Sequence, residues 1–245
     1  MEINNPDGNP NDRFFVTNGL LPIEMMTGQL QVGENEFETR ARANIAAIGD
    51  PGNFPTYADL SVLYNRQPDT SIEQGEPVTR FLNTNGNVTN DYEQFASDPN
   101  TFLGAADPQT GYRVAQAFLN FQGQQGFVFE NNQYVFGPVF DPLFVFGLPV
   151  TDAYWVNVEV AGEAVPVLFQ IFERRVLTYN PANDASFRVE MGNVGQHYYQ
   201  WRYGDQQPTP TATVQADTTA TATVEPTAGT AEPTATTTTA PYPNP

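Results

Sequence analysis

WVNVEVAGEAVPVLFQIFERRVLTY, residues 155–179, contains three apolar stretches separated by short turns. The first stretch, residues 155–160, alternates apolar and polar side chains, which is typical of a half-buried strand. Gly162 provides a turn, residues 165–172 form a second apolar stretch, and a Glu-Arg-Arg turn leads into residues 176–179. Turn residues between β-rich stretches indicate hairpins. We therefore predict a three-stranded antiparallel meander.

Helical periodicity is found on both sides of this meander. Apolar side chains at helical spacing predict a helix over residues 110–122 that ends at Gly123. The same spacing predicts a short closing helix over residues 194–201. Thr56 and Asp59 have the spacing of a capping box, which predicts the start of a further short helix.

The remaining segments are less regular. Residues 127–146 are rich in aromatic side chains and interrupted by Pro, which predicts short strands, and residues 34–109 are expected to form an irregular insertion around one short helix. We predict an α+β fold of short antiparallel strands with three to four short helices, packed as one domain over residues 1–205. Residues 206–245 are rich in Thr, Pro and Ala and are expected to be a disordered stalk, either glycosylated outside the cell or an unmodified linker.

Composition excludes several kinds of chemistry. The net charge is −18, all ten cationic residues are Arg, and the chain has no Cys. We expect no nucleic-acid partner, because a strongly acidic protein gains nothing from counterion release. Disulfides and thiolate zinc sites are excluded by the lack of Cys. No apolar run reaches the length of a membrane span, so we expect no membrane insertion, and we expect a monomer.

Two segments have similar sequences. Residues 23–33 and residues 189–195 both follow an Asn-Pro pair, and both contain an apolar-Glu-Met step followed by two Gly. This similarity predicts a repeat whose first copy, residues 1–33, is the rear half of a unit. The chain also starts without a signal peptide. Together these observations lead us to expect a missing N-terminal portion and an extracellular or cell-surface location.

A resemblance to a known family lies between Thr110 and Gly204. Residues 146–152 read FGLPVTD, and residues 169–179 read FQIFERRVLTY. In this order they resemble the LGFP repeat, in the degenerate form found in secreted proteins of green non-sulfur bacteria. The resemblance implies that residues 110–205 form one unit with a role in cell-wall or envelope association. It implies no catalytic residues.

The Gly-x-Pro segment has a physical role of its own. Gly147 can adopt a positive φ and Pro149 fixes its own φ, so both suit a tight turn. Thr151 or Asp152 could cap a short turn that follows. We interpret these four residues as a structural turn, with a ligand-contacting loop as the alternative.

Catalytic groups are scarce. The only His, His197, falls on the apolar side of the closing helix, and no Ser lies in a nucleophile-elbow pattern. Glu24 and Glu190 occupy matching positions of the two similar segments, which favours a structural role over paired acid and base. Asp7, Asn9 and Asn11 offer oxygen atoms at a spacing suited to calcium, but an Asx-rich turn explains them as well. We expect no enzyme and no cofactor, with calcium as an open possibility.

Aromatic side chains are the remaining recognition chemistry. They combine apolar faces with polar tips, which suits stacking on sugars, although packing in the core is an alternative for each. The candidate ligand-binding residues are Tyr154, Trp155, Tyr198, Tyr199 and Trp201. The sequence therefore predicts a non-catalytic module that binds or spaces cell-wall polysaccharide, with a glycan or another surface protein as partner. The alternative is an ancillary domain of a secreted hydrolase.

Overall fold

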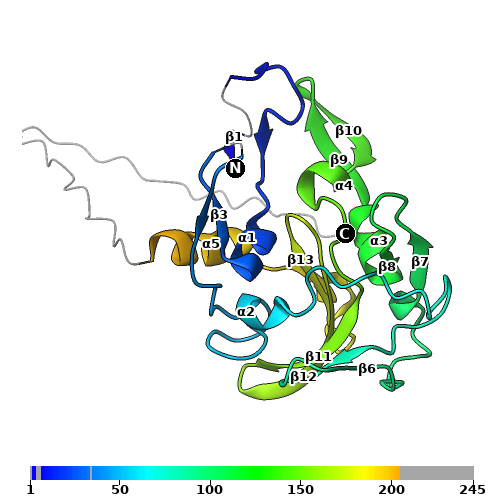
Figure 1. Cartoon of the computed structure of the whole chain (residues 1–245). Helices are drawn as coiled ribbons and strands as arrows, with labels where there is room; N and C mark the ends of the chain where they lie inside the picture. The colour runs from blue at the N-terminus through cyan, green and yellow to red at the C-terminus, as the bar shows by residue number, and fades with distance from the viewer. Residues whose placement is uncertain (1, 4–6, 34, 205–245) are drawn as a thin grey trace, which may run out of the picture. The chain divides into compact units, whose positions relative to one another are not determined.

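The computed structural model describes residues 2–3, 7–33 and 35–204. Its centre is a six-stranded sheet in the order β14-β13-β12-β11-β5-β6 (Figure 1). These strands are β5 Phe81–Leu82, β6 Val88–Thr89, β11 Tyr154–Val160, β12 Glu163–Ile171, β13 Val176–Tyr179 and β14 Val189–Met191. The predicted meander is confirmed, because β12 pairs antiparallel with both β11 and β13. The positive φ angles of Ala161 and Gly162 form the tight turn between β11 and β12.

The sheet is buried on both faces, and successive side chains of a strand contribute to different cores. Val156, Val158 and Phe169 belong to one core, whereas Trp155 and Leu168 belong to the other. This explains why the centre of the meander is apolar at consecutive positions.

Helices cover both faces. Helices α1 Leu21–Thr27, α2 Tyr57–Leu60 and α5 Val194–Tyr203 pack on the face of Val156. Helix α3 Gln116–Gln122 packs on the face of Trp155, so the sheet lies between α3 and the other three helices (Figure 1). Helix α4, Pro142–Val145, lies in the loop before β11.

Small ladders and 3-10 turns complete the fold. The two-stranded ladders are β1 Glu2–Ile3 with β2 Val16–Thr17, β3 Gln29–Gln31 with β4 Phe37–Thr39, β7 Leu103–Ala106 with β8 Arg113–Ala115, and β9 Gln125–Glu130 with β10 Gln133–Pro138. The 3-10 turns are η1 Pro99–Thr101 and η2 Ala185–Phe187. The predicted α+β class is thus confirmed, although the described residues contain five α-helices, one more than the upper expectation.

Two local predictions have different outcomes. The capping box is confirmed: the Thr56 side chain accepts from Asp59 N–H, and the Asp59 carboxylate accepts from Thr56 N–H. The helix predicted over residues 110–122 begins only at Gln116, because residues 113–115 pair with β7 instead. Pairing with a distant strand therefore overrides the helical spacing of Val114.

The predicted repeat is wrong as a structural statement. Residues 23–33 contain the end of helix α1 followed by strand β3, whereas residues 189–195 contain strand β14 followed by the start of α5. The order of helix and strand is reversed. The contacts differ too, since Glu24 lies in a buried helix and Glu190 in an exposed strand paired with β13. The two segments are similar in sequence, but contacts with different parts of the protein determine their structures.

The described residues up to 204 cluster into one compact unit. Met25, Met26 and Leu30 lie in the same core as Val156, so the N-terminal segment is not a separate piece. The expected stalk, residues 206–245, lies outside the described residues. No helix of the described residues has the length and apolar character that a membrane span requires.

Candidate functional site

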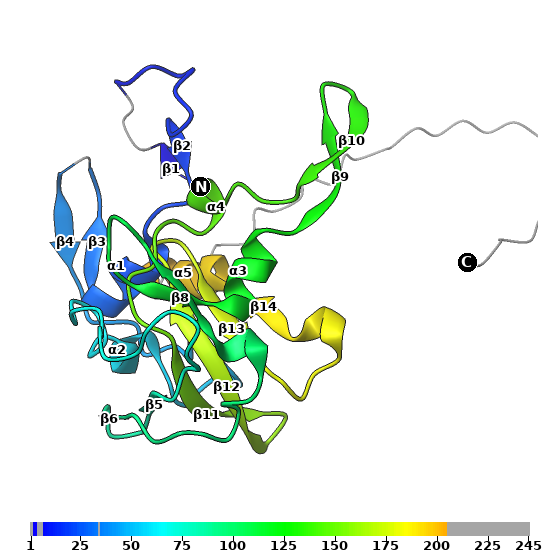
Figure 2. The same cartoon turned by 90° about the vertical axis from the view of Figure 1, so that its right-hand side faces the viewer.

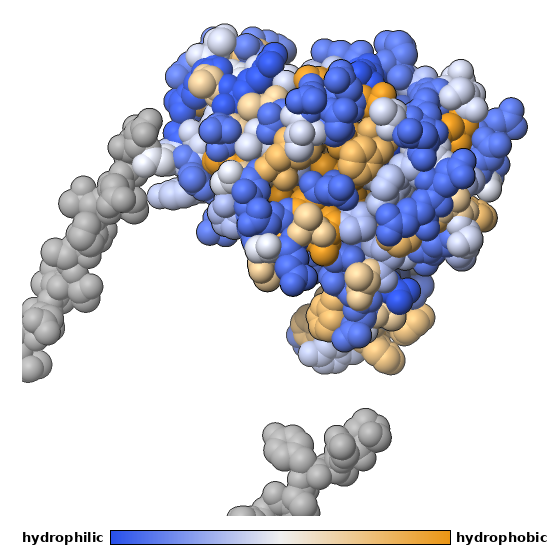
Figure 3. Space-filling model, turned by 90° about the horizontal axis from the view of Figure 1, so that it is seen from below, coloured by the Kyte–Doolittle hydropathy of each residue, from blue (hydrophilic) through white to orange (hydrophobic). Residues whose placement is uncertain are grey.

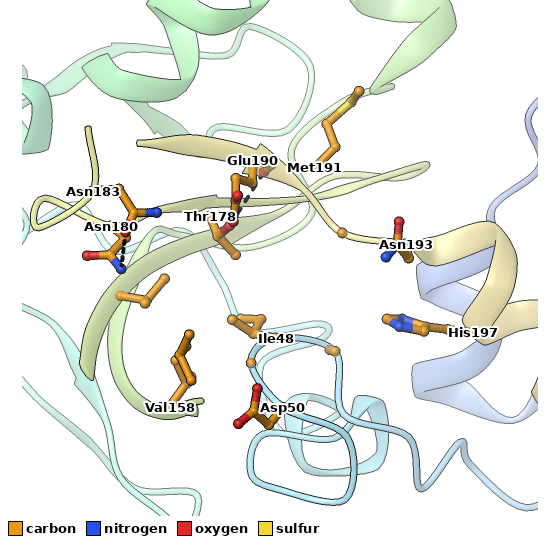
Figure 4. Close-up of a pocket in the computed structure, with 15 residues that line it drawn as sticks. Ile48, Asp50, Val158, Thr178, Asn180, Asn183, Glu190, Met191, Asn193 and His197 are labelled. Atoms are coloured by element: carbon orange, nitrogen blue, oxygen red, sulfur yellow. Dashed lines mark hydrogen bonds between the residues drawn. The ribbon is translucent and has the colours of Figure 1, made fainter. Parts of the chain in front are cut away.

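A cavity of about 540 Å³ lies at one end of the central sheet (Figure 4). Its walls come from the loop before α2, strands β11 to β14 and the start of α5. Ile48, Val158 and Val167 contribute apolar side chains, which we call the apolar floor of the cavity. Its polar side chains are Asp50, Thr178, Asn180, Asn183, Glu190, Asn193 and His197.

Strands β13 and β14 supply one side. Thr178 and Glu190 are cross-strand partners, and the Thr178 hydroxyl donates to the Glu190 carbonyl oxygen at 3.5 Å. Glu190 is exposed, and no hydrogen bond or ion pair within the described residues uses its carboxylate. Its carboxylate oxygens are thus available as acceptors.

The loop before α2 supplies the opposite side, where Asp50 lies across the cavity from Glu190 (Figure 4). Asp50 N–H donates to the Glu159 carbonyl at 2.7 Å, and Asp50 Oδ2 accepts from Gly162 N–H at 3.2 Å. Gly49 has a φ of +76°, and a Cβ there would lie 2.7 Å from the Glu159 carbonyl oxygen. Only glycine therefore allows this close approach.

Three amides line the cavity: Asn180 and Asn183 lie in the connection between β13 and β14, and Asn193 lies beside His197 on the other side (Figure 4). Asn180 Nδ2 donates to Asn183 Oδ1 at 3.1 Å, and Asn180 Oδ1 accepts from Ala182 N–H at 3.0 Å. These bonds fix the orientation of Asn180. Asn193 precedes α5, and its side chain makes no capping hydrogen bond to that helix. Its amide can therefore donate and accept within the cavity.

His197 has a defined hydrogen-bond partner. Its Nδ1 lies 3.0 Å from the Tyr57 hydroxyl. Burial lowers the pKa of His197 and raises the pKa of Tyr57, so both groups are neutral at pH 7. The two groups share one hydrogen bond, and its direction depends on which ring nitrogen of His197 carries the proton. His197 is thereby a neutral polar group at the wall of the cavity.

The chemistry of the cavity follows from these groups. Two carboxylates, three amides, a hydroxyl and a neutral imidazole surround an apolar floor, and neither Arg nor Lys is among the lining residues. An anionic ligand would meet uncompensated carboxylates and would be repelled. An uncharged ligand with several hydroxyl groups could donate to the carboxylates and place its C–H faces on the apolar floor.

The predicted aromatic site is not assembled. Tyr154 and Trp155 are 3% and 0% exposed, and they contribute to opposite cores. Tyr198 is buried and Trp201 packs against the same core, where its indole N–H donates to the Ala41 carbonyl. Tyr199 is the exposed member of the set. A fully buried ring cannot stack on a sugar, so Trp155 is a core residue. None of the five predicted residues lines the cavity of Figure 4.

Glu24 and Glu190 have different surroundings in the structure. Glu24 is buried, and its Oε2 accepts from the Tyr198 hydroxyl at 2.7 Å and from Gln31 N–H at 3.1 Å. Glu24 therefore connects helices α1 and α5 and strand β3. The predicted structural role of Glu24 is confirmed, whereas Glu190 lines the cavity.

Asp7, Asn9 and Asn11 lie in an exposed turn cluster. Asn11 N–H donates to Asn9 Oδ1, and Asp12 N–H donates to the Asn9 carbonyl. Asn9 thus forms the Asx-type turn expected as the alternative to calcium. Among the described residues, no group of three His, Asp or Glu side chains could hold a metal ion.

The Gly-x-Pro segment forms the predicted turn. Gly147 has a φ of +74°, and Pro149 bridges to Phe172. Thr151 and Asp152 do not cap a following turn, because only Ala153 separates them from strand β11. Instead the Thr151 hydroxyl accepts from Ile171 N–H at 3.2 Å.

Asp152 belongs to a second cavity of about 410 Å³, which Tyr154 also lines. Buried Arg80 lies 3.1 Å from an Asp69 oxygen and 3.8 Å from an Asp152 oxygen. Burial raises the pKa of Asp152 although Arg80 opposes the shift. Arg66 also lines this cavity, so two arginines balance the two carboxylates. This balance indicates a structural cluster and makes the first cavity the better candidate site.

Comparison with known proteins finds no match among family models, curated proteins or solved structures. The resemblance to the LGFP repeat remains a prediction.

The sequence singles out Glu190 and His197, but it does not predict that they share a cavity with Asp50 and the asparagines. Asp50 is followed by Pro51 and Gly52, which signals a turn, but nothing local places that turn against the end of β11. The Asn180-Pro181 pair precedes one of the two similar segments, and nothing in its sequence indicates a cavity. The sheet brings both turns to the same cavity.

Proposed function

We propose that this protein is a non-catalytic module that binds an uncharged glycan in the cavity between Asp50 and Glu190. The observation that carries the proposal is the lining itself, which combines two carboxylates and three amides with an apolar floor and no basic side chain. Sugar hydroxyl groups donate to carboxylates and exchange hydrogen bonds with amides, while sugar C–H faces contact apolar side chains. The Thr-, Pro- and Ala-rich sequence of residues 206–245 supports a location outside the cell.

The size of the cavity supports one or two sugar rings, since ligand sites commonly occupy about 300–1,000 Å³. The net charge of −18 favours an uncharged polysaccharide over an acidic one. Weak binding is expected for a single open site, because association costs several kcal/mol before any contact contributes.

Glu190→Gln tests the proposal directly. Co-sedimentation of the full chain with insoluble neutral polysaccharides and with cell-envelope fractions measures retention. We expect the wild type to be retained and Glu190→Gln to lose most of its retention, because the amide replaces one acceptor oxygen by a donor. Unfolding of the variant should be unchanged, since no described contact uses the carboxylate.

Glu130→Gln is the matched control, because Glu130 is also an exposed glutamate in a strand but lies outside the cavity. It should be retained like the wild type. Equal loss in both variants would indicate a nonspecific charge effect and contradict the proposal. Release of soluble sugar by the wild type, abolished in Glu190→Gln, would assign an enzyme instead.

A further inference from the structure

Strands β9 and β10 form a hairpin that projects from the body of the protein (Figure 2). Its two-residue turn, Asn131-Asn132, has positive φ at both positions, which matches the twist of a tight antiparallel hairpin. Within the part of the chain that the structure describes, the two strands pair only with each other. A two-stranded hairpin without further support is marginally stable in water.

One face of this hairpin carries four exposed aromatic side chains. Phe127 is opposite Phe136, and Phe129 is opposite Tyr134, so alternation places all four on the same face. They are 77%, 67%, 60% and 76% exposed, in that order. Figure 3 shows apolar surface gathered on the lobe that projects at the lower edge of the view.

The opposite face has a different character. It carries Val128 and Val135, which are half-buried, together with Glu130, the hairpin's charged residue. The aromatic face is therefore uncharged, although the whole chain has a net charge of −18. Two acidic copies can approach each other through this face without bringing carboxylates together.

We propose that the aromatic face of the β9–β10 hairpin binds the same face of a second copy of this chain. An aromatic side chain buries about 150–250 Å², so four rings exposed to this degree offer roughly 500 Å² per copy. Two such faces bury about 1,000 Å² in total, which meets the lower limit for a specific interface. A weak, concentration-dependent dimer follows, in place of the monomer expected from the sequence.

Other occupants fit the geometry less well. The rings of each cross-strand pair are inclined at 81° and 62°, so they do not form the flat platform on which a sugar stacks. The tip of the hairpin consists of Glu130, Asn131 and Asn132, and insertion into a bilayer would bury these polar groups first. A second hairpin can fit inclined rings edge to face, as aromatic pairs prefer.

Sedimentation velocity of the full chain over a dilution series tests the proposal. We expect a monomer–dimer equilibrium in the wild type and at least about a tenfold rise in Kd for the double variant Phe127→Ser/Phe136→Ser. Val128→Ser/Val135→Ser replaces a cross-strand pair on the opposite face by serine and should leave the Kd within about threefold of wild type. Higher salt should strengthen the dimer by screening the repulsion between the acidic copies.

A variant that unfolds the hairpin could also lose dimerisation, so Tyr134→Glu provides a second test. It keeps a long side chain on an exposed strand while placing a carboxylate on each aromatic face, and it should yield a monomer with an unchanged circular dichroism spectrum. A wild type that stays monomeric at all concentrations would overturn the proposal. A dimer that resists all aromatic-face variants, or wild-type retention on phosphatidylcholine vesicles that Phe127→Ser/Phe136→Ser abolishes, would overturn it as well.

Discussion

Replacing Tyr198 by Phe should destabilise the protein by removing a hydrogen bond between helices α5 and α1. Tyr198 is 8% exposed and Glu24 is 3% exposed, and the hydroxyl donates to Glu24 Oε2 at 2.7 Å. Tyr198→Phe preserves the ring but removes one donor from a buried carboxylate. A hydrogen bond to a charged group contributes about 1.5–3 kcal/mol. Arg202 Nη1 also donates to this hydroxyl at 3.1 Å, but it is partly exposed and adds little.

We therefore expect the free energy of unfolding to fall by about 2 kcal/mol. Urea unfolding followed by circular dichroism measures this change, and the midpoint should fall by about 1 M if m is about 2 kcal/mol/M. Tyr199→Phe is the matched control, because Tyr199 is 52% exposed and should change the free energy by less than about 0.5 kcal/mol. Equal effects of the two variants would refute the proposed contact.

The hydrogen bond between Tyr198 and Glu24 also predicts that the free energy of unfolding depends on pH in alkaline solution. Burial, together with the hydrogen bond to the Glu24 carboxylate, raises the pKa of Tyr198 above its usual value near 10. A raised pKa means that the folded state keeps its proton after the unfolded state has lost it. The contribution to stability is therefore complete below about pH 10 and declines as the pH rises further. The difference between wild type and Tyr198→Phe should shrink over this range.

Three further predictions concern other parts of the account. Gly147→Ala should destabilise the protein by about 1–3 kcal/mol, because φ is +74° and the new Cβ would lie 2.6 Å from Glu173 Cβ; an unchanged urea midpoint would contradict the turn. Trp155→Phe removes the indole N–H that donates to the Val78 carbonyl at 2.9 Å, so stability should fall by about 1–3 kcal/mol while polysaccharide retention by the folded variant stays the same. Burial lowers the pKa of His197, so its neutral form stabilises the fold above pH 6.5 and this contribution declines as the pH falls. In urea unfolding, the free energy of unfolding of His197→Gln should therefore fall less between pH 7 and pH 5 than that of the wild type. An identical fall in both proteins would exclude His197 as a source of the pH dependence.

The meander and helix α5 could be predicted because their evidence is local. Residues 155–160 alternate along one strand, and Val194, His197, Tyr198 and Trp201 repeat along one helix. The capping box at Thr56 is equally local. Such patterns report the conformation of a segment without knowledge of its neighbours.

Features that depend on distant contacts could not be predicted in this way. Strand β5 pairs parallel with β11 at a single register position, Phe81 with Trp155, and its own sequence is too short to show a pattern. The cavity brings Asp50 and Glu190 together across more than half of the chain. The two similar segments adopt different structures for the same reason. Residues 189–191 pair with β13 as a strand, whereas residues 23–27 pack on the core as part of helix α1.

Methyl NMR of Ile48 tests the glycan-binding cavity most directly. Ile48 lies on the apolar floor, whereas Ile72 packs against the core on the opposite face of the sheet and serves as an internal reference. In a titration with a soluble, uncharged oligosaccharide from any polysaccharide that retains the protein, we predict that the Ile48 δ1 methyl signal shifts and the Ile72 signal does not. A titration that leaves Ile48 unchanged while the protein remains bound would contradict the account.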